Sequence, residues 1–398
     1  MSAPRWLPPV HSPLSAAALL RGFAAAFGIL DAAALRALAR RLDDSVILTG
    51  SGTEALQLAI GAAARGRGVA LPAYGCFDLA TAAVGAGVPV YLYDLDPATL
   101  GPDWPSLAAA VRETGAVVVA HPYGVPVDVR RVRELALAHD SLVIEDAAQG
   151  AGVLVDGCDA GRSGTFGILS FGRGKGRTGG GGGALLLNDQ AALDAAAGME
   201  SALGPASSPM RGMVAASAQW CWSRPGWFAI PSALPWLRLG ETIYRNPTPP
   251  RRMPDAFAAV ADALWLQGER ESIARRTNAE RLLATLPLLE TLVPRGPAQA
   301  TPGWLRLPLV LTKAMSSALL EPADLRLGIR PAYPATLDQL PALRPLLAEP
   351  GAAYPGASLL VERLRTVPVH GQLAHSDLEA LQARLASVVQ GIQAQRPQ

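Results

Sequence analysis

The stretch Ser170-Phe-Gly-Arg-Gly-Lys-Gly-Arg-Thr-Gly-Gly-Gly-Gly-Gly183 places one lysine, Lys175, inside a run of glycines. The apolar segments on either side, Phe166–Ser170 and Ala184–Leu187, are expected to be buried strands. Glycine gives the loop a backbone freedom that no other residue allows, and it leaves the lysine amine approachable. Such an amine can form a Schiff base with a carbonyl compound. Taken alone, however, the loop favours a simpler interpretation, a flexible turn with a solvated lysine.

Strands and helices alternate upstream of this loop. The expected strands are Ser45–Leu48, Val69–Leu71, Val88–Tyr93, Ala116–Ala120 and Leu142–Ile144. The expected helices are residues 14–43, Glu54–Ala64, Leu79–Gly85, Trp104–Thr114 and Val127–Ala138. This alternation predicts an α/β fold, with a mostly parallel central sheet flanked by helices on both faces. Ligands of such sheets bind outside the strand ends, in the loops.

The second part of the chain has a different pattern. Residues 225–254 are Pro-rich and aperiodic, which is typical of a connector, and a long helix is expected over Asp255–Leu283. Beyond it, the strand-like run Trp304–Leu311 and the helical run Leu373–Val389 indicate a smaller C-terminal α+β domain. We therefore expect a large N-terminal unit over residues 1–254 and a second unit over residues 255–398.

Composition excludes several classes of protein. Half of the 398 residues are apolar and only 17% are charged, so the chain is expected to fold, and a net charge of +2 does not predict nucleic-acid binding. The three cysteines have no metal-ligand spacing and form no paired framework, which fits a reducing cytoplasm and no metal site. We expect neither a signal peptide nor a membrane span.

The nearest approach to a membrane span is Met213–Leu239. It carries four tryptophans together with prolines that would break a spanning helix. The segment is interpreted either as an interfacial or partner-binding surface, which includes a membrane surface, or as a buried irregular connection. The sequence does not decide between these alternatives.

Two further motifs stand at expected strand ends. Gly50-Ser-Gly-Thr53 precedes a helix, where free backbone N–H groups and hydroxyls suit a phosphate, although the same residues also suit an ordinary helix cap. Asp146 ends a strand, followed by Ala147-Ala-Gln149. A carboxylate at that place is costly without a cation, either an arginine or a protonated pyridine nitrogen.

These motifs together resemble the DegT/DnrJ-type sugar aminotransferases, which are pyridoxal-phosphate (PLP) enzymes of the aspartate aminotransferase fold, fold type I. The resemblance extends from about residue 45 onward, and the order and spacing of the motifs make it specific. It rests on Ser51–Leu56, Pro72–Gly87, Pro89–Asp94, His121–Gly124, Glu145–Gln149, Ser170–Phe171 and Lys175, and further on Tyr354–Leu360 and Val367–His370.

The resemblance implies a role for each matching residue. Lys175 would hold the cofactor as a Schiff base and then move the proton, and Asp146 would pair with the pyridine nitrogen. The implied phosphate ligands are Gly52, Thr53 and Ser170, and Gln149 would hydrogen-bond near the ring hydroxyl. The family's ring-stacking aromatic aligns with Cys76, and Tyr74 or Phe77 could take its place. His121 and His370 receive no catalytic role.

Two further departures concern side chains that the family usually has. Its glutamate six residues after the lysine is Gly181 here. Its Asn-Tyr-Arg-Met segment, whose asparagine reaches a neighbouring subunit's phosphate, is Pro250-Arg-Arg-Met253 here. Arg251 or Arg252 could supply a donor instead, Asn246 is also near in sequence, and solvated arginines are an equal alternative.

The resemblance therefore predicts a PLP-dependent aminotransferase that moves an amino group from an amino acid such as glutamate to a keto-sugar, nucleotide-linked, in glycan or secondary-metabolite biosynthesis. It also implies a homodimer with shared sites, for which the cysteine usage favours the cytoplasm. One alternative is a PLP-dependent sugar dehydratase, which Lys175 disfavours because that branch typically has histidine there. Another is a non-catalytic or regulatory relative, which Cys76, Gly181 and Pro250 favour. The sequence does not identify the sugar, the carbon aminated or the donor.

Overall fold

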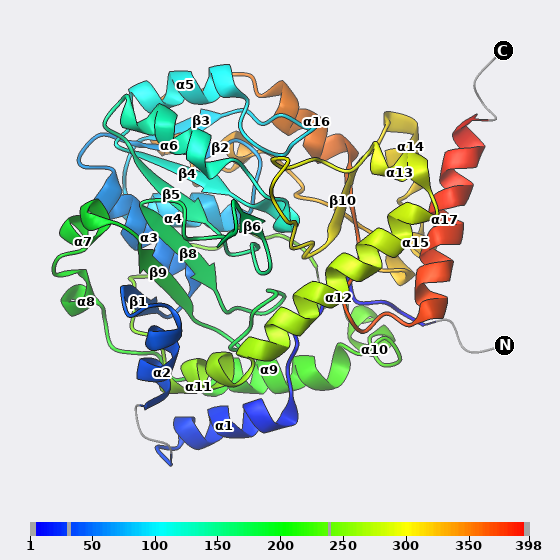
Figure 1. Cartoon of the computed structure of the whole chain (residues 1–398), viewed down its shortest axis with the longest axis horizontal. Helices are drawn as coiled ribbons and strands as arrows, with labels where there is room; N and C mark the ends of the chain where they lie inside the picture. Colours follow the sequence, from blue (N-terminus) through cyan, green and yellow to red (C-terminus); the bar gives the residue numbers. More distant parts are fainter. Residues whose placement is uncertain (1–4, 30–32, 238–239, 394–398) are drawn as a thin grey trace.

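The computed structural model describes residues 5–29, 33–237 and 240–393 (Figure 1). A seven-stranded sheet forms its centre, with the strand order β1-β9-β8-β5-β4-β2-β3. Only β9 runs against the others, so the predicted mostly parallel sheet is confirmed. The strands are β1 (Val46–Thr49), β2 (Val69–Pro72), β3 (Val90–Tyr93), β4 (Ala116–Ala120), β5 (Leu142–Asp146), β8 (Phe166–Ser170) and β9 (Gly183–Leu187).

Helices cover both faces of this sheet. Alternate residues of one strand show it: Val118 packs in the core beneath α3 and α4, whereas Val117 and Val119 pack against α5 and α6. A strand that is buried on both faces needs an unbroken apolar sequence, which β4 has. The helices of this part are α3 (Gly52–Ala63), α4 (Phe77–Ala86), α5 (Trp104–Arg112), α6 (Val129–Leu137), α7 (Gln190–Ala195) and α8 (Met199–Ala202), with the 3-10 turn η1 (Pro122–Gly124).

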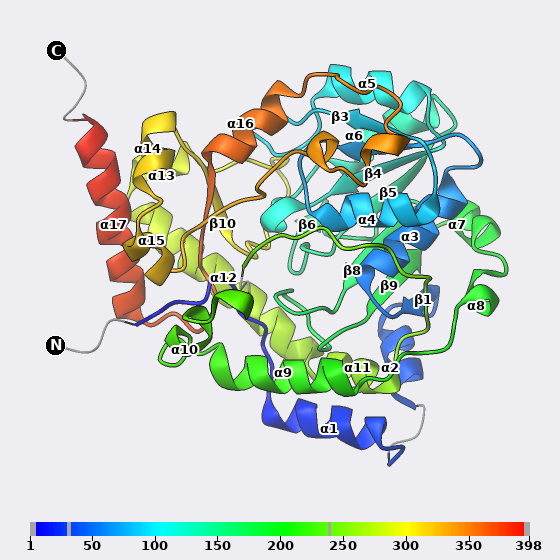
Figure 2. The same ribbon diagram turned by 180° about the vertical axis from the view of Figure 1, so that it is seen from behind.

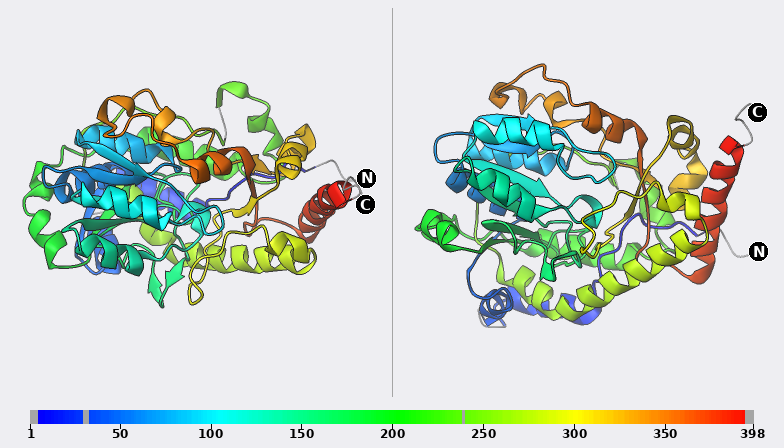
Figure 3. Two further views of the ribbon diagram at one scale, coloured as in Figure 1. Left: turned by 90° about the horizontal axis from the view of Figure 1, so that it is seen from above. Right: turned by 45° about the horizontal axis from the view of Figure 1, so that its top comes forward.

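A smaller antiparallel sheet, with the order β10-β12-β11, lies in the C-terminal part. The long helix α12 (Trp265–Ala284) runs from α11 (Asp255–Ala263) to α17 in the further views (Figure 3). The remaining elements are β6 (Leu154–Val155), β7 (Cys158–Asp159), α13 (Pro287–Glu290), β10 (Leu307–Val310), α14 (Lys313–Ala318), α15 (Pro322–Arg326), β11 (Arg330–Pro331), η3 (Leu337–Gln339), η4 (Arg344–Leu346), α16 (Pro355–Arg363), β12 (Leu364–Val367) and α17 (His375–Gln393). The boundary at residue 254 stays a prediction.

Two predicted helices are each divided in the structure. The helix expected over residues 14–43 is α1 (Ala16–Ala26) and α2 (Ala33–Arg41), because Gly28 takes a left-handed φ of 70° and ends the first one. The helix expected over residues 255–283 is α11 (Asp255–Ala263) and α12 (Trp265–Ala284). Leu264 leaves the helical conformation between them, with φ −99° and ψ 2°. The break allows α11 to pack against α1 and α2 while α12 extends to the C-terminal part.

The Trp-rich region is not the buried irregular connection that was one of its two interpretations. Its first part is the helix α9 (Met210–Trp222), followed by the short turns α10 (Ala229–Ser232) and η2 (Pro235–Leu237). Residues 241–250 then cross the molecule without regular structure, as Figure 2 shows from behind. The hydroxyl of Thr81 on α4 donates to the carbonyl of Arg245 over 2.8 Å and holds this connector against the large sheet's helices.

Among the described residues, no helix has both the length and the apolar character that crossing a bilayer requires.

Candidate active site

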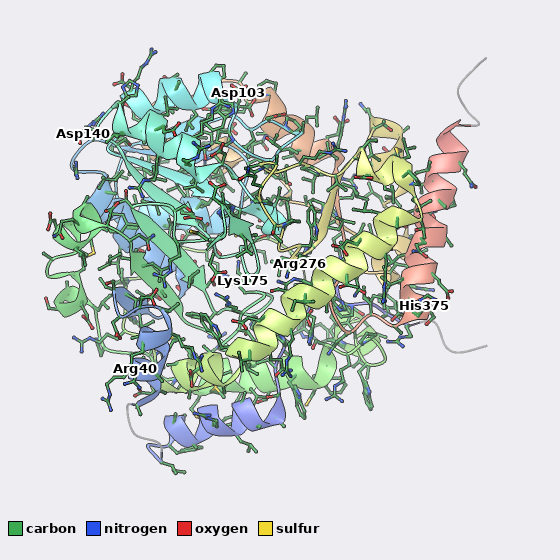
Figure 4. All side chains as sticks on the ribbon, in the orientation of Figure 1. Arg40, Asp103, Asp140, Lys175, Arg276 and His375 are labelled. Atoms are coloured by element: carbon green, nitrogen blue, oxygen red, sulfur yellow. The ribbon has the colours of Figure 1, made fainter. Side chains whose placement is uncertain are left out.

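Lys175, which is labelled in Figure 4, lines a cavity at the carboxyl ends of the parallel strands. The cavity encloses about 730 Å³, including space open to solvent. Eight of the residues predicted from the sequence line it, namely Gly52, Thr53, Tyr74, Cys76, Asp146, Gln149, Ser170 and Lys175. The three strand-end motifs are therefore brought together, as expected for loops at one edge of a parallel sheet.

The N-terminus of α3 forms one wall of the cavity. The hydroxyl of Ser51 caps the helix by accepting from the N–H of Glu54 over 3.2 Å, and Gly52 and Thr53 of the first turn line the cavity. Gly52 is needed here because a Cβ at this position would lie 2.8 Å from Cβ of Ser170. This close approach puts the Ser170 hydroxyl beside the positive end of the helix dipole, an arrangement that suits a phosphate.

Asp146 ends β5, between the parallel strands β4 and β8. One carboxylate oxygen accepts from the N–H of Ala148 over 2.9 Å. Burial raises the pKa of Asp146, and the Ala148 N–H and the nearby Lys175 amine offset only part of that effect. A raised pKa means that the carboxylate lacks a full cationic partner inside the chain. An arginine was the other possible partner for Asp146. Among the described residues, no arginine forms an ion pair with Asp146.

The Lys175 loop is held in place by contacts on both sides of the lysine. The N–H of Gly174, which has a left-handed φ of 76°, donates to the hydroxyl of Ser12 over 2.9 Å. On the other side, a Cβ at Gly176 would lie 2.9 Å from the guanidinium of the buried Arg275. The glycines therefore allow close packing against neighbours, and the loop is not simply a flexible turn.

A tyrosine cluster that the sequence did not predict surrounds Gln149. The Gln149 amide donates to the hydroxyl of Tyr333 over 2.6 Å, and its oxygen accepts from the N–H of Tyr123 over 2.9 Å. The rings of Tyr123 and Tyr333 are stacked, with centroids 5.4 Å apart, and the hydroxyls of Tyr74 and Tyr123 are 3.0 Å apart. Tyr333 comes from the C-terminal part and lines the cavity. Tyr123 lies in a motif noted from the sequence, but nothing in the sequence indicated Tyr333.

Of the three candidates for the ring-stacking position, two border the cavity. Cys76 lies at the start of α4, and its thiol donates to Asp78 over 3.5 Å. Burial raises the pKa of this thiol to about 12, so it is neutral near neutral pH. The ring of Tyr74 is fixed by its hydroxyl contact with Tyr123. Phe77 packs into the core and does not line the cavity.

Arg252 and its neighbours lie away from the cavity within this chain. Arg252 is exposed, and its backbone pairs with Thr49 in an isolated bridge. The backbone N–H of Arg251 donates to Glu54 over 2.8 Å, and Asn246 is exposed. The prediction that Arg252 serves a partner's site therefore stays untested by one chain.

The histidine of the His121-Pro-Tyr-Gly124 motif has a buried carboxylate partner. His121 Nε2 and Glu145 Oε1 are 2.9 Å apart, and both side chains are fully buried. His121 Nδ1 accepts from the N–H of Val127 over 3.1 Å, so Nε2 carries the proton and donates it to Glu145. Burial pushes the pKa of Glu145 upward, but the contact with His121 and the backbone N–H donors, including that of Gly164, together lower it. This pair supports β5 beside Asp146.

The whole-chain match agrees with this geometry. A family model described as the DegT/DnrJ/EryC1/StrS aminotransferase family matches residues 33–386. The chain belongs to this family. PLP is the cofactor of the family, so the cofactor expected from the sequence is confirmed at that level. Members of the DegT/DnrJ/EryC1/StrS family with solved structures share the fold along almost the whole chain.

Two of these structures illustrate the likeness. The aminotransferase TlmJ from Streptoalloteichus hindustanus superimposes with a TM-score of 0.74 at 22% identity, over 97% of this chain and 100% of that one. The sugar aminotransferase CalS13 from Micromonospora echinospora gives 0.72 at 21% identity, over 96% and 99%. At such identities the likeness confirms the fold and does not identify a substrate.

Curated relatives match over shorter stretches. The L-glutamine:2-deoxy-scyllo-inosose aminotransferase of Streptomyces kanamyceticus is 37% identical over 163 residues, which is 39% of this chain and 38% of that protein. The GDP-perosamine synthase of Caulobacter vibrioides is 34% identical over 168 residues, 42% and 44%. A pleiotropic regulatory protein of Geobacillus stearothermophilus is 36% identical over 125 residues, 31% and 34%. The matched stretches thus span less than half of each relative.

The residues of the cavity fit the family's cofactor. The α3 N-terminus with Ser170 offers donors to a phosphate, and Asp146 has a raised pKa that a pyridinium cation would relieve. Lys175 lines the same cavity, so one bound molecule could reach all three. The aromatic face that the family usually provides is the weakest part of the fit, because Cys76 stands there.

Proposed function

We propose that this chain transfers an amino group from an amino acid to the carbonyl carbon of a keto-sugar that is linked to a nucleotide. Glutamate is the expected donor, and glutamine is the first alternative because relatives carry L-glutamine in their names. One observation carries the proposal: Lys175, Asp146 and the N-terminus of α3 line the same cavity. The membership of the aminotransferase family supports it.

Each residue has a distinct task in the proposed reaction. Lys175 Nζ would hold the cofactor and then, once released by the donor, carry the proton between the substrate carbon and the cofactor. Asp146 would keep the pyridine nitrogen protonated. Gly52, Thr53 and Ser170 would bind the phosphate. When bound, PLP supplies the electron sink for the carbanion that proton removal creates.

Gln149 would orient the ring through its amide, which Tyr123 and Tyr333 fix. Its oxygen accepts from the Tyr123 N–H and its nitrogen donates to the Tyr333 hydroxyl. Because both the oxygen and the nitrogen of the Gln149 amide are already hydrogen-bonded, little side-chain entropy is lost when the amide orients the ring. Tyr333 also brings the C-terminal part to the wall of the cavity, where the sugar would enter.

The assembly and setting complete the proposal. We expect a homodimer with shared sites, in which Arg252 of one copy is near the phosphate of the other, and a cytoplasmic location. We also propose that residues 1–254 form the cofactor-binding unit and residues 255–398 the second unit. Symmetric dimers are the commonest soluble assembly.

The first experiment is spectroscopic. Purified chain incubated with PLP should gain the visible absorption of a cofactor bound through a lysine, and an amino donor should convert it to the pyridoxamine form. A set of nucleotide-linked keto-sugars should then return the original spectrum, which identifies the acceptor. No absorption change after addition of PLP would exclude the enzyme and favour the non-catalytic alternative.

A further inference from the structure

The Trp-rich segment, defined here as residues 210–237, has an unusual composition. From Glu200 to Glu241 the sequence contains no acidic residue between these two, whereas it contains three arginines. The arginines are Arg211, Arg224 and Arg238, and the tryptophans are Trp220, Trp222, Trp227 and Trp236, half of the eight in the chain. The function proposed above uses none of these residues.

The apolar side chains of this segment are exposed rather than packed. Trp227 is 57% exposed and Trp236 is 72% exposed, and Ile230 and Leu237 are exposed beside them. The rings of Trp222 and Trp227 meet edge to face, with centroids 6.0 Å apart, so the aromatic surface is organised. Removing these tryptophan rings from water would be favourable. Their exposure in this chain therefore marks a surface that binds a partner.

The neighbouring helix α1 extends the same apolar surface. It packs against α9, and α1, α9 and α10 lie along one side of the molecule in both opposite views (Figures 1 and 2). The exposed apolar residues on and just after α1 are Leu20, Phe27 and Ile29. The surface is therefore wider than the Trp-rich segment itself.

The inner side of α9 is already occupied. The Gln219 amide donates to the Ser12 hydroxyl over 3.1 Å, and that hydroxyl also accepts from the N–H of Gly174 in the Lys175 loop. Ala216 packs against Gly180, 3.1 Å from where a Cβ would be. One side of α9 thus supports the Lys175 loop, and only the outward side is free for a partner.

The charges of the surface decide which partner it fits. Arg224 lies just beyond α9 and is exposed, with its guanidinium 5.1 Å from the centre of the Trp220 ring. Arg211 is exposed on α9 itself. A second copy related by twofold symmetry would present the same patch, and residues 210–237 contain no acidic side chain that could pair with its arginines. An anionic surface would neutralise them, and tryptophan with arginine is the composition of protein surfaces at a lipid headgroup layer.

We propose that the Trp-rich segment binds the surface of an anionic lipid bilayer, with Trp227 and Trp236 inserted among the headgroups and Arg224 paired with phosphates. The chain would lie on the membrane and not cross it. This inference is independent of the reaction proposed above, because it rests on the outward side of α9 and the two turns that follow. Its test needs no catalytic activity.

The experiment is co-sedimentation of the full chain with vesicles of phosphatidylcholine alone or of phosphatidylcholine mixed with phosphatidylglycerol. We expect binding to the mixed vesicles that weakens as salt is raised. The double variant Trp227→Ser, Trp236→Ser should lose roughly tenfold or more in affinity, and Arg224→Gln roughly fivefold. The matched control, Leu137→Ser with Leu266→Ser, replaces exposed apolar residues outside the surface and should bind like the original chain.

Circular dichroism would verify that each variant is folded, and Trp236→Ser alone would replace the double variant if that one is not. The proposal fails if the original chain stays in the supernatant when either kind of vesicle is sedimented. It also fails if the tryptophan variant binds as well as the control. It also fails if that variant instead turns a dimer into a monomer in light scattering, because the surface would then join two copies. Tryptophan-dependent binding of single-stranded DNA without vesicle binding would equally overturn it.

Discussion

Replacing His370 by glutamine should reduce the loss of folding stability that the chain undergoes as the pH falls from 7 to 5. His370 is 1% exposed, and its ring lies 5.9 Å from that of His11, which is 9% exposed. His370 Nε2 is 2.9 Å from the carbonyl oxygen of Pro8 and donates to it. The buried guanidinium of Arg275 acts on both rings and disfavours a further positive charge. A glutamine amide could donate to Pro8 in the same way without titrating.

The direction follows from the pKa of each ring. Burial lowers the pKa of His370 from 6.5 to about 4, and burial with the neighbouring His370 lowers that of His11 to about 3. Between these values and 6.5 the unfolded chain binds protons that the folded chain does not. Stability therefore falls as pH drops below 6.5 and stops falling near the folded pKa. At about pH 5 the loss amounts to ~2 kcal/mol for His370, since one unit of pKa corresponds to ~1.4 kcal/mol.

The assay is denaturant unfolding at pH 7 and pH 5 for the original chain and the His370→Gln variant. Groups outside this pair contribute equally to both chains, and the variant also relieves the lowering of the His11 pKa by His370, so the difference between the two pH losses reports the His370–His11 pair. We expect the variant to lose ~2 kcal/mol less, about a thirtyfold smaller change in the unfolding equilibrium. The control is His375→Gln, because that histidine side chain is 83% exposed. An identical pH loss in the His370 variant and the original chain would refute the reasoning.

Three further predictions concern the cavity and the loop beside it. Lys175→Ala should lower turnover at least roughly a hundredfold with an unchanged unfolding midpoint, because it removes the proton carrier from a loop; transamination at the original rate would contradict the mechanism. Asp146→Ala should retain some cofactor by absorbance but lose most turnover, and an unchanged rate would exclude its pairing with the pyridine nitrogen. Gly181→Glu should destabilise the chain by about 1–3 kcal/mol in denaturant unfolding, because a Cβ there would lie 2.6 Å from the Phe257 ring. In a Phe257→Ala background the same substitution should cost less than in the original chain, and an equal cost there would show that the clash lies elsewhere.

The central sheet and the meeting of its loops could be predicted because both follow from local pattern. Unbroken apolar runs such as Ala116–Ala120 define buried strands, and parallel strands place their following loops at one edge. Asp146, Ser170 and Lys175 therefore had to lie near one another once the strands were known. The helix start at Gly52 joined them for the same reason.

The features that the sequence did not reveal depend on contacts between distant segments. Tyr333 reaches Tyr74 from 259 positions away, where its backbone N–H donates to the Tyr74 hydroxyl over 3.4 Å. No periodicity indicates such a contact. The break at Leu264 was hidden because apolar residues continue on both sides of it, so that α11 and α12 resemble one helix in sequence. Ser12, which holds the Lys175 loop, likewise precedes every strand of the sheet.

The loss of the family's glutamate at position 181 is explained by the segment that follows. Phe257 fills the space beside Gly181, and the same ring lies 2.5 Å from where a Cβ on Gly212 of α9 would be. Gly180 is in turn covered by Ala216 of α9. A glutamate at 181 would displace Phe257, and Phe257 could then no longer fit under α9. The glycine at 181 and helix α9 therefore belong to one packing unit, in which any side chain at 181 competes with Phe257 for the space beneath α9.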